Sequence, residues 1–253
     1  MSDRVITDLS KNGVLTVTLN RPDKKNAIDR EMIDGLLEAL NTAQLDSNVN
    51  VVSLRGAGED FCAGADLAEL LESAHKSPSE NAEDAQRLGN VFLAIHNLPK
   101  PVVAVVQGRA LAGGCGLATA CDMIVASESA SFGYPEVKRG FVPAMVMAML
   151  TRAVGSKVAF DLVATGRILT AREALEIGIV SRIVSDAGFE AEAQSVCEDL
   201  SASSTSALAF IKRQLKEIEG LSFEDAVALG AKVNAVARTT PDFKVAVARF
   251  LNR

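Results

Sequence analysis

Five consecutive apolar residues, VVAVV at 102–106, place the strongest constraint on how this chain folds. A β-strand of this kind has no polar face, so both of its faces must be covered by other elements. Two more β-rich runs precede it, at 14–19 and 49–54, and a helical pattern of apolar residues occupies 29–45 between them. This alternation predicts an α/β protein whose parallel strands are joined by right-handed crossovers.

Helical patterns dominate the second half of the chain. Strands are still expected at 123–126 and 180–184, but from about Glu190 the sequence is rich in alanine and predicts only helices. A chain of 253 residues suits one sizeable domain with an appendage. We therefore expect a core at 1–190 and a helical region at 191–253 that serves in oligomerisation or as a lid.

The net charge and the terminal sequence limit the partners and the location that we expect. The formal net charge is −6, which argues against nucleic acid or an anionic membrane as the main partner. The first residues lack the apolar core of a signal peptide, and no apolar stretch approaches the roughly 18 to 20 residues of a membrane span. A cytoplasmic protein is therefore expected.

Two glycine-containing loops each follow a predicted strand, at 62–66 (CAGAD) and 112–116 (AGGCG). Small residues let a ligand approach the backbone, and a helix N-terminus offers unpaired N–H groups. Two such loops side by side could each direct one N–H at a single oxygen and so form an oxyanion hole. From the residues alone, tight packing of helix against sheet is the somewhat stronger interpretation.

Other catalytic motifs are absent from the sequence. The second loop lacks the GxGxxG spacing, there is no GxSxG motif, and only two histidines occur. The four cysteines are scattered without CxxC pairing, so buried thiols and no metal site are expected. Glu136 is a carboxylate among apolar neighbours, and in an apolar pocket it could act as a general acid or base. Nothing in its local pattern ranks it above the other acids.

An ordered set of short motifs resembles the enoyl-CoA hydratase/isomerase (crotonase) superfamily. The motifs are NRP at 20–22, FCAGADL at 61–67, GGC at 113–115 with CD at 121–122, FGYPE at 132–136 and TGR at 165–167. Each motif is weak alone, but their order and spacing together are highly specific. The resemblance implies a spiral of ββα units with a C-terminal helical region, assembly into trimers or into hexamers of two trimers, and binding of acyl-CoA.

The resemblance also assigns roles to single residues. In the superfamily, the residue after the glycine of the first loop and a glycine of the second loop supply two oxyanion N–H groups, here Ala65 and Gly113. They would stabilise the enolate that forms when the α-carbon of a thioester gains or loses a proton. Glu136 matches the second of the two glutamates that hydratases use. Substrate and CoA contacts are implied at Lys24 and Lys25 (phosphates), at Ala63 and Asp66 (near the adenine), and at Ala27, Leu67, Gly114 and Gly116.

One position departs from the hydratase pattern. Gly116 stands in place of the first glutamate, which removes the carboxylate expected to position and activate water. The resemblance then implies a single-glutamate site that uses Glu136. Enoyl-CoA hydratase is the first interpretation, because residues 136–144 resemble bacterial members similar to methylglutaconyl-CoA hydratases. A Δ3,Δ2-enoyl-CoA isomerase and a non-catalytic acyl-CoA-binding subunit stay open as alternatives. No cofactor is expected beyond the CoA of the substrate.

Overall fold

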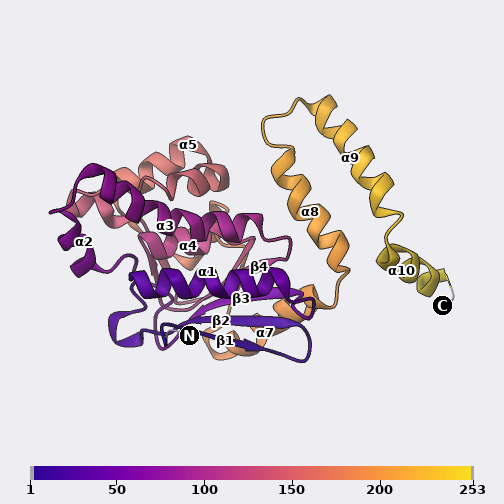
Figure 1. Ribbon diagram of the computed structural model, residues 1–253, viewed down its shortest axis with the longest axis horizontal. Helices are drawn as coiled ribbons and strands as arrows, with labels where there is room; N and C mark the ends of the chain where they lie inside the picture. Colours follow the sequence, from indigo (N-terminus) through magenta and orange to yellow (C-terminus); the bar gives the residue numbers. More distant parts are fainter. Residues whose placement is uncertain (1–2, 252–253) are drawn as a thin grey trace.

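The computed structural model describes residues 3–251 and is built around a six-stranded sheet (Figure 1). The strand order is β1-β2-β3-β4-β6-β9; β1 is antiparallel to β2, and the other neighbours are parallel. The predicted parallel sheet is therefore confirmed. Its strands are β1 (Val5–Leu9), β2 (Val14–Leu19), β3 (Val51–Gly56), β4 (Val102–Val106), β6 (Met123–Ser127) and β9 (Arg182–Val184).

Strand β4 is buried on both faces, as its apolar sequence predicts. Val102, Ala104 and Val106 belong to the main core, which also contains buried side chains of helices α1 (Arg30–Leu45), α3 (Pro78–Asn97) and α4 (Gly113–Ala120). Val103 and Val105 belong to a second core cluster on the opposite face, which is closed by helix α7 (Phe189–Ser201). The alternation of side chains along the strand thus supplies two separate apolar layers.

A second, three-stranded sheet contains β5 (Arg109–Leu111), β7 (Ser131–Gly133) and β8 (Ile168–Thr170) in that order. Strand β5 runs parallel to β7, and β7 runs antiparallel to β8. These short strands were not expected from the sequence, and neither was β1. Three residues are too few to display an alternating pattern, and four of the five residues of β1 are exposed at the sheet edge.

The helices lie mainly on one face of the large sheet. In Figure 1, α1 and α3 run across that face, and α7 lies on the other side of the strands. The helices are α1 (Arg30–Leu45), α2 (Leu67–Ser73), α3 (Pro78–Asn97), α4 (Gly113–Ala120), α5 (Met147–Thr165), α6 (Ala171–Glu176), α7 (Phe189–Ser201), α8 (Thr205–Glu217), α9 (Phe223–Ala237) and α10 (Pro241–Leu251), with short 3-10 turns η1 (Pro22–Lys24), η2 (Pro135–Arg139) and η3 (Asp186–Gly188).

The C-terminal helices leave the sheet after α7. The expected boundary at residues 190 and 191 falls inside α7, whose Phe189, Ala193 and Cys197 are buried against the sheet. Helices α8, α9 and α10 then extend to one side of the core (Figure 1). No helix among residues 3–251 is both long and apolar enough to cross a membrane.

One buried lysine fixes the start of this extension to the core. Lys212 of α8 is 7% exposed, and its Nζ donates to Asp122 Oδ2 at 2.7 Å and to Ile95 O at 2.9 Å. A third bond reaches Lys100 O at 3.1 Å. The ammonium group therefore has all three protons in hydrogen bonds, which offsets the cost of burying its charge.

Candidate active site

The first glycine loop, residues 62–66, lies between two other segments of the chain. Its first residue exchanges backbone hydrogen bonds of 2.9 and 3.0 Å with β5. On its other side, Ile28 N donates to Gly64 O at 2.8 Å, and Ile28 O accepts from Asp66 N at 2.9 Å. These bonds use the peptide groups around Ala65, whose own N–H has no acceptor among residues 3–251.

The second loop leads directly into α4. Ala112 has a φ of 51°, an unfavourable conformation for a residue with a β-carbon, and its N–H donates to Gly133 O at 2.8 Å. Gly113 follows as the first residue of the helix. A β-carbon added to Gly113 would lie 3.9 Å from the Ala65 nitrogen. The structure therefore brings the two proposed oxyanion residues together.

Neither of these two N–H groups is paired with an acceptor in the described part of the chain. The Gly113 N–H is one of the free donors at a helix N-terminus, where the helix dipole also favours negative charge. Two unpaired donors from adjacent loops can bind one oxygen and stabilise charge that develops on it.

Glu136 is a buried carboxylate in η2. It is 8% exposed, and its Oε2 is buried without a hydrogen-bond partner among residues 3–251. Burial raises the pKa of Glu136 above the ordinary glutamate value, and the hydrogen bond to its own backbone N–H and the nearby Arg139 charge oppose this only in part. A buried carboxyl group with a raised pKa is suited to act as a general acid or base.

The acid lies within electrostatic range of the oxyanion helix. Burial raises the pKa of the Cys115 thiol, on α4, to about 11, and the charge of Glu136 contributes to that rise. Cys115 is two residues from Gly113 on the same helix. Glu136 and the two free N–H groups therefore belong to one region of the molecule.

Gly116 has no room for a side chain in this structure. A β-carbon added there would lie 2.2 Å from Val146 Cγ1, 3.1 Å from Val146 Cβ and 3.6 Å from Phe92 Cζ. Val146 is 4% exposed and Phe92 is 5% exposed. The space beside Gly116 is therefore occupied by apolar groups from α3 and from the segment before α5.

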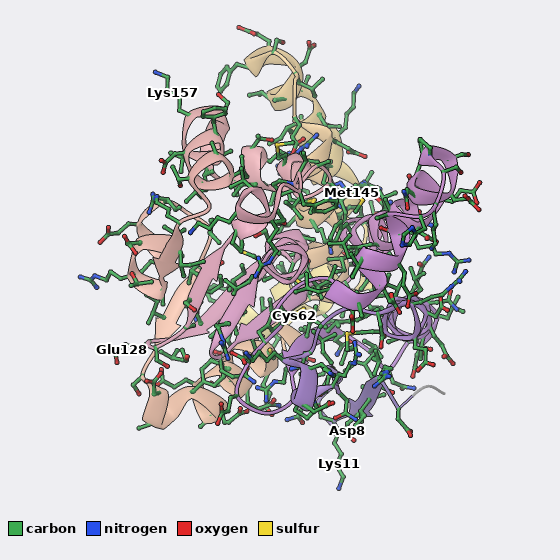
Figure 2. All side chains as sticks on the ribbon, turned by 90° about the vertical axis from the view of Figure 1, so that its left-hand side faces the viewer. Asp8, Lys11, Cys62, Glu128, Met145 and Lys157 are labelled. Carbon is green, nitrogen blue, oxygen red and sulfur yellow. The ribbon has the colours of Figure 1, made fainter. Side chains whose placement is uncertain are left out.

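Gly114 serves close packing between the two loops. A β-carbon on it would lie 2.4 Å from Cys62 O and 2.7 Å from Cys62 Sγ. Cys62, labelled in Figure 2, is fully buried, and its Sγ donates to Asn26 O at 3.0 Å. Burial raises the pKa of the Cys62 thiol to about 12, so the sulfur stays protonated.

The proposed CoA contacts surround the edge of the first loop. Lys24 and Lys25 are exposed, and Lys25 O accepts from Ala63 N at 2.9 Å, which holds η1 beside the loop. Ala27 is half-buried, and Leu67 is exposed at the start of α2. Their side chains can thus reach a ligand at the loop edge.

Asp66 is engaged in the fold itself. Its carboxylate accepts from Ala68 N at 2.8 Å as the N-cap of α2 and pairs with Arg21 NH1 at 2.7 Å. These contacts hold its pKa below the ordinary aspartate value, mainly through the backbone hydrogen bond at Ala68. The Asp66 carboxylate is therefore engaged in contacts within the protein and is not directed toward a ligand.

The sequence did not single out three structural features of this site. Asn26 is fully buried, and its Nδ2 donates to Ala57 O at 2.9 Å and to Asp60 O at 2.7 Å. Val146 closes the space over Gly116, although the two lie thirty positions apart. Tyr134, beside Glu136, is also fully buried. The one available signal was compositional, since Tyr134 is the only tyrosine in the chain.

The described residues contain no group of three or more histidine, cysteine, aspartate or glutamate side chains suited to holding a metal ion. What the site does contain is a pair of free backbone donors, a buried acid and apolar walls. This combination is suited to chemistry in which an oxyanion forms while a nearby carboxyl group moves a proton.

Comparison with known proteins places this arrangement in a class. The family model for enoyl-CoA hydratase/isomerase matches residues 10–253. A putative enoyl-CoA hydratase of Thermus thermophilus is 40% identical over 248 residues, which is 98% of each chain. A short-chain-enoyl-CoA hydratase of Clostridium acetobutylicum is 32% identical over 97% of this chain and 94% of its own. The crystal structure of an enoyl-CoA hydratase from Mycobacterium smegmatis superposes with a TM-score of 0.93 at 33% identity, covering 99% and 97% of the two chains.

These matches define an acyl-CoA enzyme class with the crotonase fold, so the fold expected from the motifs is confirmed. The chain belongs to the enoyl-CoA hydratase/isomerase family.

Proposed function

We propose that this protein is an enoyl-CoA hydratase that uses Glu136 as its single catalytic carboxylate. The observation that carries the proposal is the buried Glu136 Oε2, which has no partner among the described residues and lies near two unpaired backbone donors. An acid buried without a partner is costly to the fold, and such groups are concentrated at functional sites.

The proposed reaction begins with the thioester carbonyl oxygen at the N–H groups of Ala65 and Gly113. Water attacks C3 of the enoyl group, and Glu136 accepts the proton that the water loses. The resulting enolate oxygen is stabilised by the two N–H groups, each of which is worth about 2.7–4 kcal/mol of barrier in comparable sites. Glu136 then returns the proton to C2, so one molecule of water has been added and the carboxylate is regenerated.

An isomerase is the alternative that one specific observation favours. Apolar atoms of Val146 and Phe92 occupy the position over Gly116, where a second acid would otherwise hold water. A site without that group could remove a proton from C2 of a 3-enoyl-CoA and return it at C4, again through Glu136. Hydratase remains the proposal because the named relatives that cover nearly the whole chain are hydratases.

The test is to incubate the protein with 2-enoyl-CoA and 3-enoyl-CoA substrates of straight and branched chains. Mass spectrometry and the absorbance of the conjugated thioester distinguish the outcomes. A gain of one water supports the hydratase, a double-bond shift at constant mass supports the isomerase, and an unchanged substrate that still binds supports a non-catalytic subunit.

Replacing the acid tests its role. Glu136→Gln is expected to lower kcat by about 10²–10⁴-fold, because the amide cannot accept the proton, while acyl-CoA binding survives. Removing a buried, unpaired charge should leave the variant folded and at least as stable at neutral pH. Glu128→Gln is the matched control, since Glu128 is exposed at the margin of the molecule (Figure 2). Near-normal turnover by Glu136→Gln would overturn the assignment.

We also propose that Lys24 and Lys25 contact the CoA phosphates, because both are exposed at the edge of the first loop.

Assembly into a trimer or a hexamer is part of the proposal and is supported by the apolar surface of the C-terminal helices. A cytoplasmic location is proposed because all four cysteines are free thiols, which persist in a reducing compartment.

A further inference from the structure

Tyr134 makes a hydrogen bond that connects two catalytic segments. The side chain is fully buried, and its Oη lies 2.9 Å from Thr119 Oγ1. Tyr134 precedes Pro135 and Glu136, whereas Thr119 lies in α4, the helix that begins with Gly113. A buried phenol needs a hydrogen-bond partner, and here the partner belongs to a different element.

The direction of this hydrogen bond follows from the neighbouring contact. Thr119 Oγ1 donates its single proton to Cys115 O at 2.8 Å. The threonine oxygen therefore acts as the acceptor toward Tyr134, and the tyrosine Oη donates. As a result, replacing the phenol by a phenyl ring removes the bond to Thr119 and the interaction with the Cys115 side chain, but it leaves the Thr119 hydroxyl paired with its carbonyl.

A second connection joins the same two segments on the other side. Ala112 N donates to Gly133 O at 2.8 Å. Ala112 directly precedes Gly113, and Gly133 directly precedes Tyr134. The backbone bond and the side-chain bond together fix the segment that carries Glu136 relative to the helix that carries an oxyanion donor.

The carboxyl group of Glu136 interacts with its own backbone N–H but has one unpaired oxygen. Glu136 Oε2 has no partner within residues 3–251, so the carboxylate is not held by a bond at that oxygen. Its position depends on the backbone of η2, which begins immediately after Tyr134. Proton transfer requires the acid and the substrate carbon at close range, and displacements of about 1 Å can cost ~100-fold in rate.

We propose that Tyr134 is a positioning residue that holds Glu136 at its working distance from the oxyanion hole through Thr119. This inference rests on the proposed function, since it concerns the acid of that reaction. Tyr134 acts on the placement of the carboxyl group and not on the N–H groups that bind the thioester. Its removal should therefore slow proton transfer without weakening binding.

The test compares Tyr134→Phe with the wild type on the enoyl-CoA substrate that the wild type converts best. The expected result is a kcat about tenfold lower with KM changed less than about twofold. The rate at which C2 hydrogens of a saturated acyl-CoA exchange with D₂O should fall in parallel. The absorbance shift of a bound conjugated thioester, which reports the oxyanion hole, should stay unchanged. Tyr134→Phe should have no further effect on a Glu136→Gln background, because the positioned group is already gone.

Three further variants make the test decisive. Ser53→Ala removes a hydroxyl that is equally buried but lies in β3 beside Cys197, and it should leave kcat unchanged. If Tyr134→Phe does not fold, Thr119→Ala removes the acceptor instead, and Thr119→Ser restores it; the first should lower kcat selectively and the second should recover it.

The inference is overturned if Tyr134→Phe keeps wild-type kcat, if KM rises as much as kcat falls, or if the loss is the same on the Glu136→Gln background. A wild type that converts no enoyl-CoA overturns the proposed function and this inference together. A wild type that is active alongside an equally active Tyr134→Phe overturns this inference alone.

Discussion

Gly116 and Val146 share one small volume, because the side chain that the glycine lacks is supplied by the valine. The distance of 2.2 Å between Val146 Cγ1 and a β-carbon on Gly116 is far below any normal contact. In a closely packed interior, such a steric overlap forces the neighbouring side chains or backbone to shift, because there is no empty space to take up the added atom. A larger side chain at position 116, including an acid, would therefore require a smaller residue at position 146.

Gly116→Ala is therefore expected to destabilise the fold by about 1–2 kcal/mol, since overpacking outweighs the gain in helix propensity. Urea denaturation measures the change. In the double variant with Val146→Ala, the loss should be smaller than the sum of the two single losses. Gly113→Ala is the matched control for stability, because its nearest neighbour would be 3.8 Å away and no loss is expected. Additive effects of Gly116→Ala and Val146→Ala would show that the two positions do not compete.

At the scale of elements, the first loop and α2 depend on a carboxylate that faces inward. Asp66 caps α2 at Ala68 N and pairs with Arg21, which also contacts Asp29 Oδ2 at 3.2 Å. The Asp66 and Asp29 carboxylates are thus linked through one guanidinium group. This arrangement holds the peptide after Gly64 in place, and that peptide carries the Ala65 N–H.

Asp66→Ala is expected to lower the free energy of unfolding by about 1–2 kcal/mol at neutral pH, through loss of the cap and the ion pair. The pKa of Asp66 is lowered in the folded state, so this stabilisation is fully present above the ordinary aspartate pKa. It is lost as the pH falls through the lowered value, and the two proteins should then converge. Asp84→Ala is the control, because the Asp84–Lys76 pair is about 40% exposed and contributes little. An effect of Asp66→Ala that is independent of pH would contradict the role of its charge.

Sequence reasoning located the long elements well and the short ones poorly. The strands at 14–19 and 102–106 were predicted because burial imposes a clear apolar pattern on them. Strand β1 was missed because only its pairing with β2 defines it, and its side chains are mostly exposed. Three-residue strands such as β7 are created by contacts with residues far along the chain, and no local pattern announces them.

In the candidate site, too, local sequence patterns indicated some features, whereas contacts between distant residues could not be predicted from them. Local residues alone favoured packing over catalysis for the glycine loops, and Gly114 does serve packing. Ala65, Gly113 and Glu136 were proposed through the family resemblance, because their roles depend on three segments that meet only in the folded chain. The filling of the Gly116 position by Val146 is a tertiary contact between distant residues. No periodicity or motif could have predicted it.

At the scale of the whole molecule, the C-terminal helices carry an apolar surface that the rest of this chain leaves uncovered. They pack on one another and are joined to the core mainly through α8 and Lys212 (Figure 1). Monomeric proteins rarely expose apolar surface on this scale, so it is suited to a second copy of the chain. The exposed large apolar residues here are Ile211, Leu215, Leu221, Phe223, Val227, Val236, Phe243, Val245, Val247, Phe250 and Leu251.

The double variant Phe223→Ser, Phe250→Ser is expected to shift the protein toward single chains, because these two rings are 79% and 76% exposed in one chain. Analytical ultracentrifugation should give three or six chain masses for the wild type and a lower, concentration-dependent value for the variant. Lys157→Ser, at an exposed position of α5 (Figure 2), should leave the mass unchanged. A wild type that sediments as a single chain at all concentrations would contradict the proposed assembly.

The burial of Cys62 has one more consequence. Its thiol lies beneath the first loop with a pKa of about 12, so an alkylating reagent can reach it only when that loop lifts from β5. The rate at which Cys62 is alkylated therefore reports how often the loop that carries the Ala65 N–H opens. A ligand that bridges Ala65 and Gly113 should lower the rate of this alkylation.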